Sequence, residues 1–374
     1  MLSAIFALYV LASDTALARP PEPAPDKIAL AQLDGYSRAL EDSESFAGVV
    51  LVAHGGKQLF LRPYGKRDQQ GEDPITTDMR FNIASAGKMF TATAVLQLIA
   101  AQKLSLDTRV GDVIKDYPNK EFAQKVTVRH LLTHMAGAGD VDLFGADKQS
   151  VRANIRSHAD MLALHWERAP AFEPGTQQVY GNFGHVILGR MIELLSGQDY
   201  DGYVRDHIFT PAGMSRTDFA NCADYRTDTA IGYTSVDGKA VPNCITQPTK
   251  GFAAGGAFST AGDLFRFVEA LRQGRLVPKP LFVQAITTQH GFMGLGFFAT
   301  EYGENIPKRN FRWGHGGSSD GACSDVRTYP NTGETVIVLS NRDAPACFSI
   351  ASLLHRAYED EQKARRPSAQ LHPK

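Results

Sequence analysis

A serine and a lysine three residues apart open a long apolar run in this sequence. Ser85 and Lys88 lie within residues 81–90, and a helix that begins near Ser85 would bring both side chains to one face. A serine hydroxyl becomes an effective nucleophile when a base takes its proton, and a partly desolvated lysine amine can be that base. The pair therefore predicts nucleophilic catalysis. The competing interpretation is a helix N-cap serine followed by a solvated lysine.

Two later groups carry side chains that suit the same chemistry. Tyr180 and Asn182 follow a Pro-Gly turn signal, in a loop that leads into a predicted helix. His315 opens a His-Gly-Gly triplet within a predicted β run. The helix expected after Ser85 is apolar on nearly all sides, so it belongs in the protein interior. This favours the catalytic interpretation of Ser85.

The order of these groups resembles that of a known family of serine enzymes. The three groups are similar to the Ser-x-x-Lys, Tyr-x-Asn and Lys/His-x-Gly motifs of the serine penicillin-recognising family. That family includes class C β-lactamases, D-alanyl-D-alanine carboxypeptidases, D-amino-acid amidases and related esterases. Residues 131–137, 184–197 and 254–264 also resemble it, and the similarity spans residues 40–360. The resemblance implies a serine hydrolase that forms an acyl-enzyme and needs no metal or cofactor.

The fold implied by the resemblance is α+β. It has an antiparallel β-sheet flanked by N- and C-terminal helices, with an inserted, mainly helical lobe over about residues 90–260. The pattern of the chain agrees, because a helical period precedes a β-branched run. Helices are expected at residues 28–40, 125–134 and 349–361, and strands at 46–53, 58–62, 294–298, 311–317, 325–329 and 335–339.

The resemblance also implies a role for each catalytic side chain. Ser85 would attack the acyl carbon, and Lys88 would supply charge and a proton route. Tyr180, with its pKa lowered by nearby cations, would act as general base for acylation and then pass the proton to the leaving group. The side chain of Asn182 would orient Lys88 or the substrate amide.

The third motif would bind the substrate. By resemblance, the backbone N–H groups of Ser85 and Ser318 form the oxyanion hole. Gly316 and Gly317 would let a substrate pair with the strand as an added strand does. His315 would contact the substrate beside them.

The chain departs from the family pattern at two positions. His315 stands where class C β-lactamases have lysine, and a histidine attracts a β-lactam carboxylate less strongly. This favours a D-peptidase, amidase or esterase over a true β-lactamase. Gly181 stands where serine or alanine is usual, which adds loop freedom. Arg309 and Arg312 are candidates to hold a substrate carboxylate, or to lie on a solvated strand face.

The motifs leave three alternative interpretations open. The sequence Gly-Ser-Ser-Asp-Gly at 317–321 matches the Gly-x-Ser-x-Gly pattern of α/β-hydrolases, which requires a strand followed by a helix. His130 and His134 have the spacing of a zinc pair, but the glutamate of the zincin pattern is absent. A non-catalytic penicillin-binding-type sensor on the same fold is the third alternative.

Composition limits the class of partner. The chain has 374 residues, 43% of them hydrophobic and 21% charged, with a formal net charge of −1. This charge balance favours neither nucleic acid nor an anionic membrane as a partner. The expected partner is a small-molecule or short-peptide substrate that carries an amide, an ester or a β-lactam.

The ends of the chain and its cysteines suggest export. Residues 1–18 resemble a secretory signal peptide, although no basic residue precedes the apolar run. Residues 19–27 would be a proline-rich linker, 28–361 a single domain, and 362–374 a disordered tail. A periplasmic or secreted protein can form disulfides. Short loops favour the pairs Cys222–Cys244 and Cys323–Cys347, with four buried thiols as the alternative.

Overall fold

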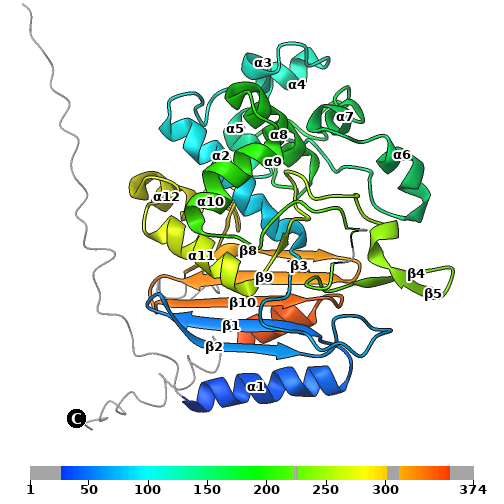
Figure 1. Cartoon of the computed structure of the whole chain (residues 1–374). Coiled ribbons are helices and arrows are strands. Elements are labelled where there is room, and N and C mark those ends of the chain that lie inside the picture. Colours follow the sequence, from blue (N-terminus) through cyan, green and yellow to red (C-terminus); the bar gives the residue numbers. More distant parts are fainter. Residues whose placement is uncertain (1–26, 223, 225, 301–310, 354–374) are drawn as a thin grey trace, which may run out of the picture.

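The main sheet is built from strands at both ends of the chain (Figure 1). The computed structural model describes residues 27–222, 224, 226–300 and 311–353. Six antiparallel strands lie in the order β2-β1-β10-β9-β8-β7. Their bounds are β1 Gly48–His54, β2 Lys57–Tyr64, β7 Phe298–Thr300, β8 Arg312–Ser319, β9 Ala322–Tyr329 and β10 Glu334–Ser340.

Strand β1 is buried on both faces, which explains its continuous apolar sequence. Val49 and Leu51 pack into the larger core, shared with the helical lobe, while Val50 and Val52 pack into a smaller core on the opposite face. The neighbouring strand β10 alternates in the same way. A strand covered on both faces has apolar residues at every position rather than at alternate ones.

Helices cover both faces of this sheet. Helix α1 and the helical residues 346–353 contribute to the smaller core, and the helical lobe lies over the other face (Figure 1). The expected α+β arrangement is therefore confirmed. The helices are α1 Lys27–Asp42, α2 Lys88–Ala100, α3 Val110–Val113, α4 Lys120–Lys125, α5 Val128–Leu132, α6 Gln149–Ala153, α7 His158–Ala163, α8 Phe183–Ser196, α9 Tyr200–Val204, α10 Thr210–Ala212, α11 Ala261–Arg272 and α12 Lys279–Ile286.

Shorter elements complete the described fold. They are the 3-10 turns η2 Ala84–Gly87, η3 Ala146–Lys148 and η5 Asn243–Ile245, the π-helical η4 Arg205–Phe209, the pair β3 Phe81–Asn82 and β6 Phe258–Ser259, and the hairpin β4 Tyr233–Val236 and β5 Lys239–Pro242.

The structure corrects several predicted boundaries. The helix expected at 125–134 is shorter than predicted. Lys125 ends α4, and the next helix, α5, spans Val128–Leu132. It does not reach His134, because that residue adopts a positive φ of 57°. Residues 294–297 are not a strand; β7 begins only at Phe298. The chain turns at 330–333 between β9 and β10, as predicted. Residues 317–321 run from β8 into an antiparallel hairpin with β9, so the α/β-hydrolase interpretation is wrong.

Two disulfides join cysteines that lie 22 and 24 residues apart in the sequence. Cys222 pairs with Cys244 and Cys323 pairs with Cys347, with Cα–Cα distances of 5.6 and 6.1 Å. The pairing expected from loop length is confirmed. The second bridge ties β9 to the helical residues 346–353 in the smaller core.

The predicted signal peptide and tail lie outside the described residues, as does the linker except for Lys27, which begins α1. Within the described part of the chain, no helix has the length and apolar character needed to cross a membrane.

We predict that the double substitution Cys323→Ser and Cys347→Ser lowers the free energy of unfolding by about 3 kcal/mol. The bridge closes a loop with a sequence separation of 24, so its loss gives the unfolded chain more freedom. Urea unfolding of the oxidised protein and of the variant measures the difference. An unfolding midpoint equal to that of the parent protein would contradict the prediction.

Candidate active site

The turn that carries Ser85 is held by hydrogen bonds from two other segments of the chain. Ser85 lies in η2 rather than in a regular helix, directly after Ala84, whose φ is +44°. The Ala84 carbonyl accepts the N–H of Gly256 at 3.0 Å, and the Ile83 carbonyl accepts the hydroxyl of Ser324 at 2.6 Å. The backbone that carries the candidate nucleophile is therefore held in place, and helix α2 begins only at Lys88.

Glycine is required where the loop 251–260 meets this turn. A Cβ on Gly255 would lie 2.2 Å from the Ala84 carbonyl oxygen and 3.1 Å from the Ser85 Cα. Gly255 also has a φ of +141°, which other residues rarely adopt. The glycine-rich loop thus serves close packing against the Ser85 turn.

Lys88 is fully buried at the first position of α2. Its Nζ lies 3.0 Å from Ser85 Oγ, 2.7 Å from Asn182 Oδ1 and 2.7 Å from the Ala254 carbonyl oxygen. The alternative of a solvated lysine is therefore wrong. All three contacts lie within hydrogen-bond distance, so the amine is held in one position beside the hydroxyl.

Burial changes the charge state of this amine. Desolvation lowers the pKa of Lys88 to about 7, against an opposing attraction from Asp140. A neutral amine has two hydrogens and one lone pair. With the hydrogens donated to Asn182 Oδ1 and the Ala254 carbonyl, the lone pair remains for the Ser85 hydroxyl. Lys88 is thus suited to accept the serine proton near neutral pH.

Tyr180 contacts both Lys88 and the same hydroxyl. Its ring centroid is 4.9 Å from Lys88 Nζ, and its phenol hydrogen-bonds Ser85. The expectation of a lowered pKa is wrong. Although 37% of the residue is exposed, desolvation raises the pKa of Tyr180, and the hydrogen bond to Ser85 offsets only part of this effect. The phenol therefore keeps its proton at neutral pH and is suited to donate it.

Three buried histidines stand behind Tyr180. The His134 ring lies 4.3 Å from the Tyr180 ring and 5.1 Å from that of His185, and His315 lies 6.3 Å from Tyr180. Burial lowers the pKa of His134 to about 3, and it also lowers the pKa values of His185 and His315. All three imidazoles are therefore neutral near pH 7, and they place no positive charge beside Lys88.

Asn182 connects the amine to an acidic residue that the sequence analysis missed. Its Nδ2 donates to Asp140 Oδ1 at 2.7 Å, which leaves Oδ1 of Asn182 for Lys88. Asp140 therefore sets which end of the amide faces the amine. It lies three residues after the segment 131–137, so that segment was the available signal.

Gly181 is confined rather than free. A Cβ at this position would lie 2.3 Å from the Gly139 carbonyl oxygen and 3.0 Å from its carbonyl carbon. The prediction of added loop freedom is wrong, because the segment before Asp140 packs directly on this glycine. The N–H of Gly181 also points to His134 Nδ1 at 3.4 Å.

The backbone of strand β8 packs directly against the backbone of the Ser85 turn. A Cβ on Gly317 would lie 2.8 Å from the Ser85 backbone nitrogen and 2.3 Å from the Ile83 carbonyl oxygen. The next residue, Ser318, is exposed, and its side chain lines the same cavity as Ser85. The backbone N–H groups of Ser85 and Ser318 are thus in the right part of the site for an oxyanion hole, which stays a prediction.

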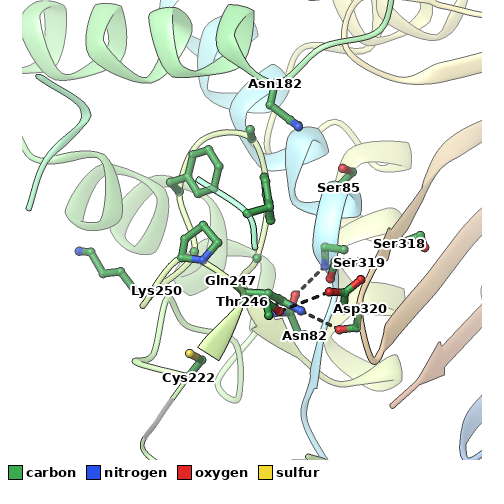
Figure 2. Close-up of a pocket in the computed structure, with 18 of the residues that line it drawn as sticks. Asn82, Ser85, Asn182, Cys222, Thr246, Gln247, Lys250, Ser318, Ser319 and Asp320 are labelled. Carbon is green, nitrogen blue, oxygen red and sulfur yellow. Dashed lines mark hydrogen bonds between the residues drawn. The ribbon is translucent and has the colours of Figure 1, made fainter. Parts of the chain in front are cut away.

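A cavity of about 290 Å³ opens at Ser85. Figure 2 shows Ser85, Asn182 and Ser318 around it, with Gln247 and Asp320 at its far end. Its wall includes residues from the loop 251–256 and from the segment 246–248, which follows η5. The volume is in the range of a small-ligand site.

His315 and Gly316 line a second hollow of about 260 Å³ and are not among the described residues that line the cavity at Ser85. His315 is buried, stacked at 3.9 Å on Phe298. Arg312 lines this hollow too, and Arg309 lies outside the described residues. The contacts of His315 and Gly316 with substrate stay a prediction.

The possible zinc pair serves local structure. The side chain of His130 accepts the N–H of Thr127 at 3.4 Å in a capping box at the start of α5, whereas the His134 ring faces Tyr180. Within the described ranges, no group of three or more histidine, cysteine, aspartate or glutamate side chains is arranged to hold a metal ion.

Comparison with known proteins identifies the family. The family model described as Beta-lactamase matches residues 33–357, so the chain belongs to the β-lactamase family. This is the serine hydrolase family that the three motifs resembled.

Individual relatives cover most of the chain. It is 30% identical over 292 residues to penicillin-binding protein 4 of Amycolatopsis lactamdurans, across 73% of this chain and 75% of that protein. It is 26% identical over 306 residues to the D-aminopeptidase of Brucella anthropi, across 75% and 54%. The solved penicillin-binding protein from Bacillus halodurans superposes with a TM-score of 0.74 at 28% identity, covering 88% and 98%.

We predict that Gly181→Ser, which restores the residue usual in the family, lowers the free energy of unfolding by about 1–3 kcal/mol. The new Cβ would collide with the Gly139 carbonyl and shift Asn182 away from Lys88. Thermal unfolding and the rate of Ser85 labelling by a fluorophosphonate measure the two effects. Gly35→Ala is the control, since a Cβ there meets nothing within 4 Å. Labelling at the parent rate would contradict the prediction.

Proposed function

We propose that this protein is a serine hydrolase that acts on D-amino-acid amides and peptides, or on esters, through an acyl-enzyme at Ser85. The observation that carries the proposal is the position of Lys88 Nζ, 3.0 Å from Ser85 Oγ in a water-excluded setting. A buried lysine with no catalytic task would be costly, because desolvation disfavours its charged form. The membership of the β-lactamase family supports the same reading.

Acylation would begin with neutral Lys88. Its lone pair takes the proton of the Ser85 hydroxyl while Oγ bonds to the acyl carbon. The carbonyl oxygen becomes an oxyanion, which the backbone N–H groups of Ser85 and Ser318 stabilise. One such donor is typically worth about 3 kcal/mol of the barrier.

Tyr180 would complete the step as proton donor. Its protonated phenol gives a proton to the leaving nitrogen or oxygen as the bond to the acyl carbon breaks, and Lys88 passes the proton that it took from Ser85 to the resulting phenolate. Water then attacks the ester at Ser85 by the reverse proton route. This order inverts the role predicted from the resemblance, since the raised pKa of Tyr180 suits an acid better than a base.

The neutral His315 supports the choice of substrate class. A lysine at this position would add a permanent charge, and the buried imidazole does not, because burial lowers its pKa. This favours amide or ester substrates over β-lactams with an obligatory carboxylate. The similarity to a D-aminopeptidase agrees with this choice. A true β-lactamase and a non-catalytic penicillin-binding sensor are the alternatives.

We also propose that the protein is periplasmic or secreted. Two disulfides join four cysteines, and disulfides persist mainly in oxidising compartments. The signal-like pattern of residues 1–18 favours the same location.

We expect kcat/KM for a neutral ester to rise with pH through about 7 and then level off. The pKa of Lys88 is lowered, so the catalytic neutral amine forms above this pH and is lost below it. Each pH unit below about 6 should reduce the rate about tenfold. Stopped-flow hydrolysis of p-nitrophenyl acetate between pH 5 and 9, corrected for the uncatalysed rate, measures the profile. A flat profile would exclude Lys88 as the base.

Replacing the nucleophile tests the function itself. Ser85→Ala should reduce turnover of p-nitrophenyl acetate and of a D-alanine amide at least about a thousandfold, with the melting temperature preserved. Mass spectrometry of the protein with a fluorophosphonate should show one adduct at Ser85 and none in the variant. A panel with nitrocefin and a D-Ala-D-Ala peptide then distinguishes a β-lactamase or carboxypeptidase. Adduct formation without turnover of any substrate would indicate the sensor instead.

A further inference from the structure

We propose that Asp320 binds a protonated amine on the acyl side of the substrate, so that the preferred substrates are amino-acyl amides with a free amino group. This inference rests on the proposed acyl-enzyme at Ser85 and adds the determinant of substrate charge. It follows from the charges in the cavity wall, from the way Asp320 is held, and from its place after Ser318.

The charged side chains around the cavity favour a cationic ligand. Among the described residues that line it, the ionisable side chains are those of Asp320 and Lys250. Lys250 forms an ion pair with Asp201 at 2.5 Å, and Figure 2 shows its side chain directed away from Ser85. The charge of Lys250 is therefore already compensated, whereas the carboxylate of Asp320 is not.

The carboxylate of Asp320 is fixed in position. Its Oδ2 accepts hydrogen bonds from the hydroxyls of Thr234 at 3.1 Å and Thr246 at 3.3 Å. In the part of the chain that the structure describes, these two bonds use the same oxygen, so Oδ1 is available to a ligand. Two neutral hydroxyls orient a carboxylate without cancelling its charge.

The backbone around Asp320 is held equally firmly. Its carbonyl oxygen accepts Nδ2 of Asn243 and Nε2 of Gln247, both at 2.7 Å. The side-chain oxygen of Gln247 in turn accepts a hydrogen bond from Nδ2 of Asn82 at 3.1 Å, and Asn82 ends β3, three residues before Ser85. Asp320 thus belongs to a polar network that extends to the strand before the catalytic turn. Such preorganisation lowers the cost of binding a charged group.

The position of Asp320 fits an amine close to the reacting carbon. It follows the proposed oxyanion donor Ser318 by two residues, in the turn that ends β8, so at most about 6.7 Å of chain separates the two residues. An α-amine lies about 2.5 Å from its carbonyl carbon, and a hydrogen bond to the carboxylate adds about 2.8 Å. The two spans are comparable, so an amine on the acyl group can reach Asp320 while the carbonyl faces Ser85 and Ser318.

The experiment compares two substrates that differ only in the amine: D-alanine p-nitroanilide and its N-acetyl derivative. The wild-type enzyme should have a kcat/KM at least about tenfold higher for the free amine, since an ion pair replaces an uncompensated carboxylate. Asp320→Asn keeps an oxygen for the two threonines and should remove this preference, mainly through KM. Asp237→Asn, on the exposed β4–β5 turn, removes the same charge away from the cavity and should keep the preference.

Hydrolysis of p-nitrophenyl acetate, which has no amine, separates this inference from the proposed function. If the wild-type enzyme does not hydrolyse the acetate, the acyl-enzyme at Ser85 is refuted, and this inference with it. Wild-type activity toward the acetate with equal rates on the two anilides, or with neither anilide cleaved, would overturn the role of Asp320 alone. An equal loss on all three substrates in Asp320→Asn would also overturn it, because it would indicate a structural role.

Discussion

The cost of burying one amine governs the arrangement of this site. Lys88 is removed from water at the base of a helix that lies in the protein interior, so its charged form is disfavoured and its pKa falls to about 7. An unpaired buried amine would destabilise the fold, and the carbonyl oxygens of Asn182 and Ala254 compensate for the lost hydration. The same contacts leave the lone pair of the neutral amine facing Ser85. The same set of hydrogen bonds therefore compensates for the burial of Lys88 and directs its lone pair at the proposed nucleophile.

This arrangement depends on backbones that approach one another more closely than side chains permit. Gly255 meets the Ser85 turn, Gly317 passes its backbone nitrogen, and Gly181 meets the segment before Asp140. Each of these contacts brings a carbonyl, an N–H group or an amide into the site from a different part of the sequence. A methyl group at any of the three would move one partner of Lys88 or Ser85 by a distance that hydrogen bonds do not tolerate.

The sequence predicted the parts of this structure that local patterns encode. The continuous apolar run of β1, the turn at 330–333 and the cysteine pairs all follow from short-range rules. The three motifs also brought Ser85, Lys88 and Tyr180 together correctly in space. The charge states were not predictable in the same way, because the pKa of Tyr180 depends on packing by distant segments that include His134 and Asp140. The partner of Asn182 was missed for the same reason: Asp140 lies 42 positions away, and only the fold brings the two together.

The division of the site into two regions explains how one fold can serve several substrates. In the proposed mechanism, Ser85, Lys88 and Tyr180 act on the acyl carbon, whatever group it carries. Their surroundings are nearly neutral, since the three histidines near Tyr180 carry no charge near pH 7. The end of β8 is different, because the next residue, Asp320, lines the cavity and is exposed. If Asp320 binds the substrate as proposed, a charge change there would alter which substrate is attracted without altering the pKa of the buried amine, because exposed charges are screened by water. Substrate charge can therefore vary independently of the chemical step.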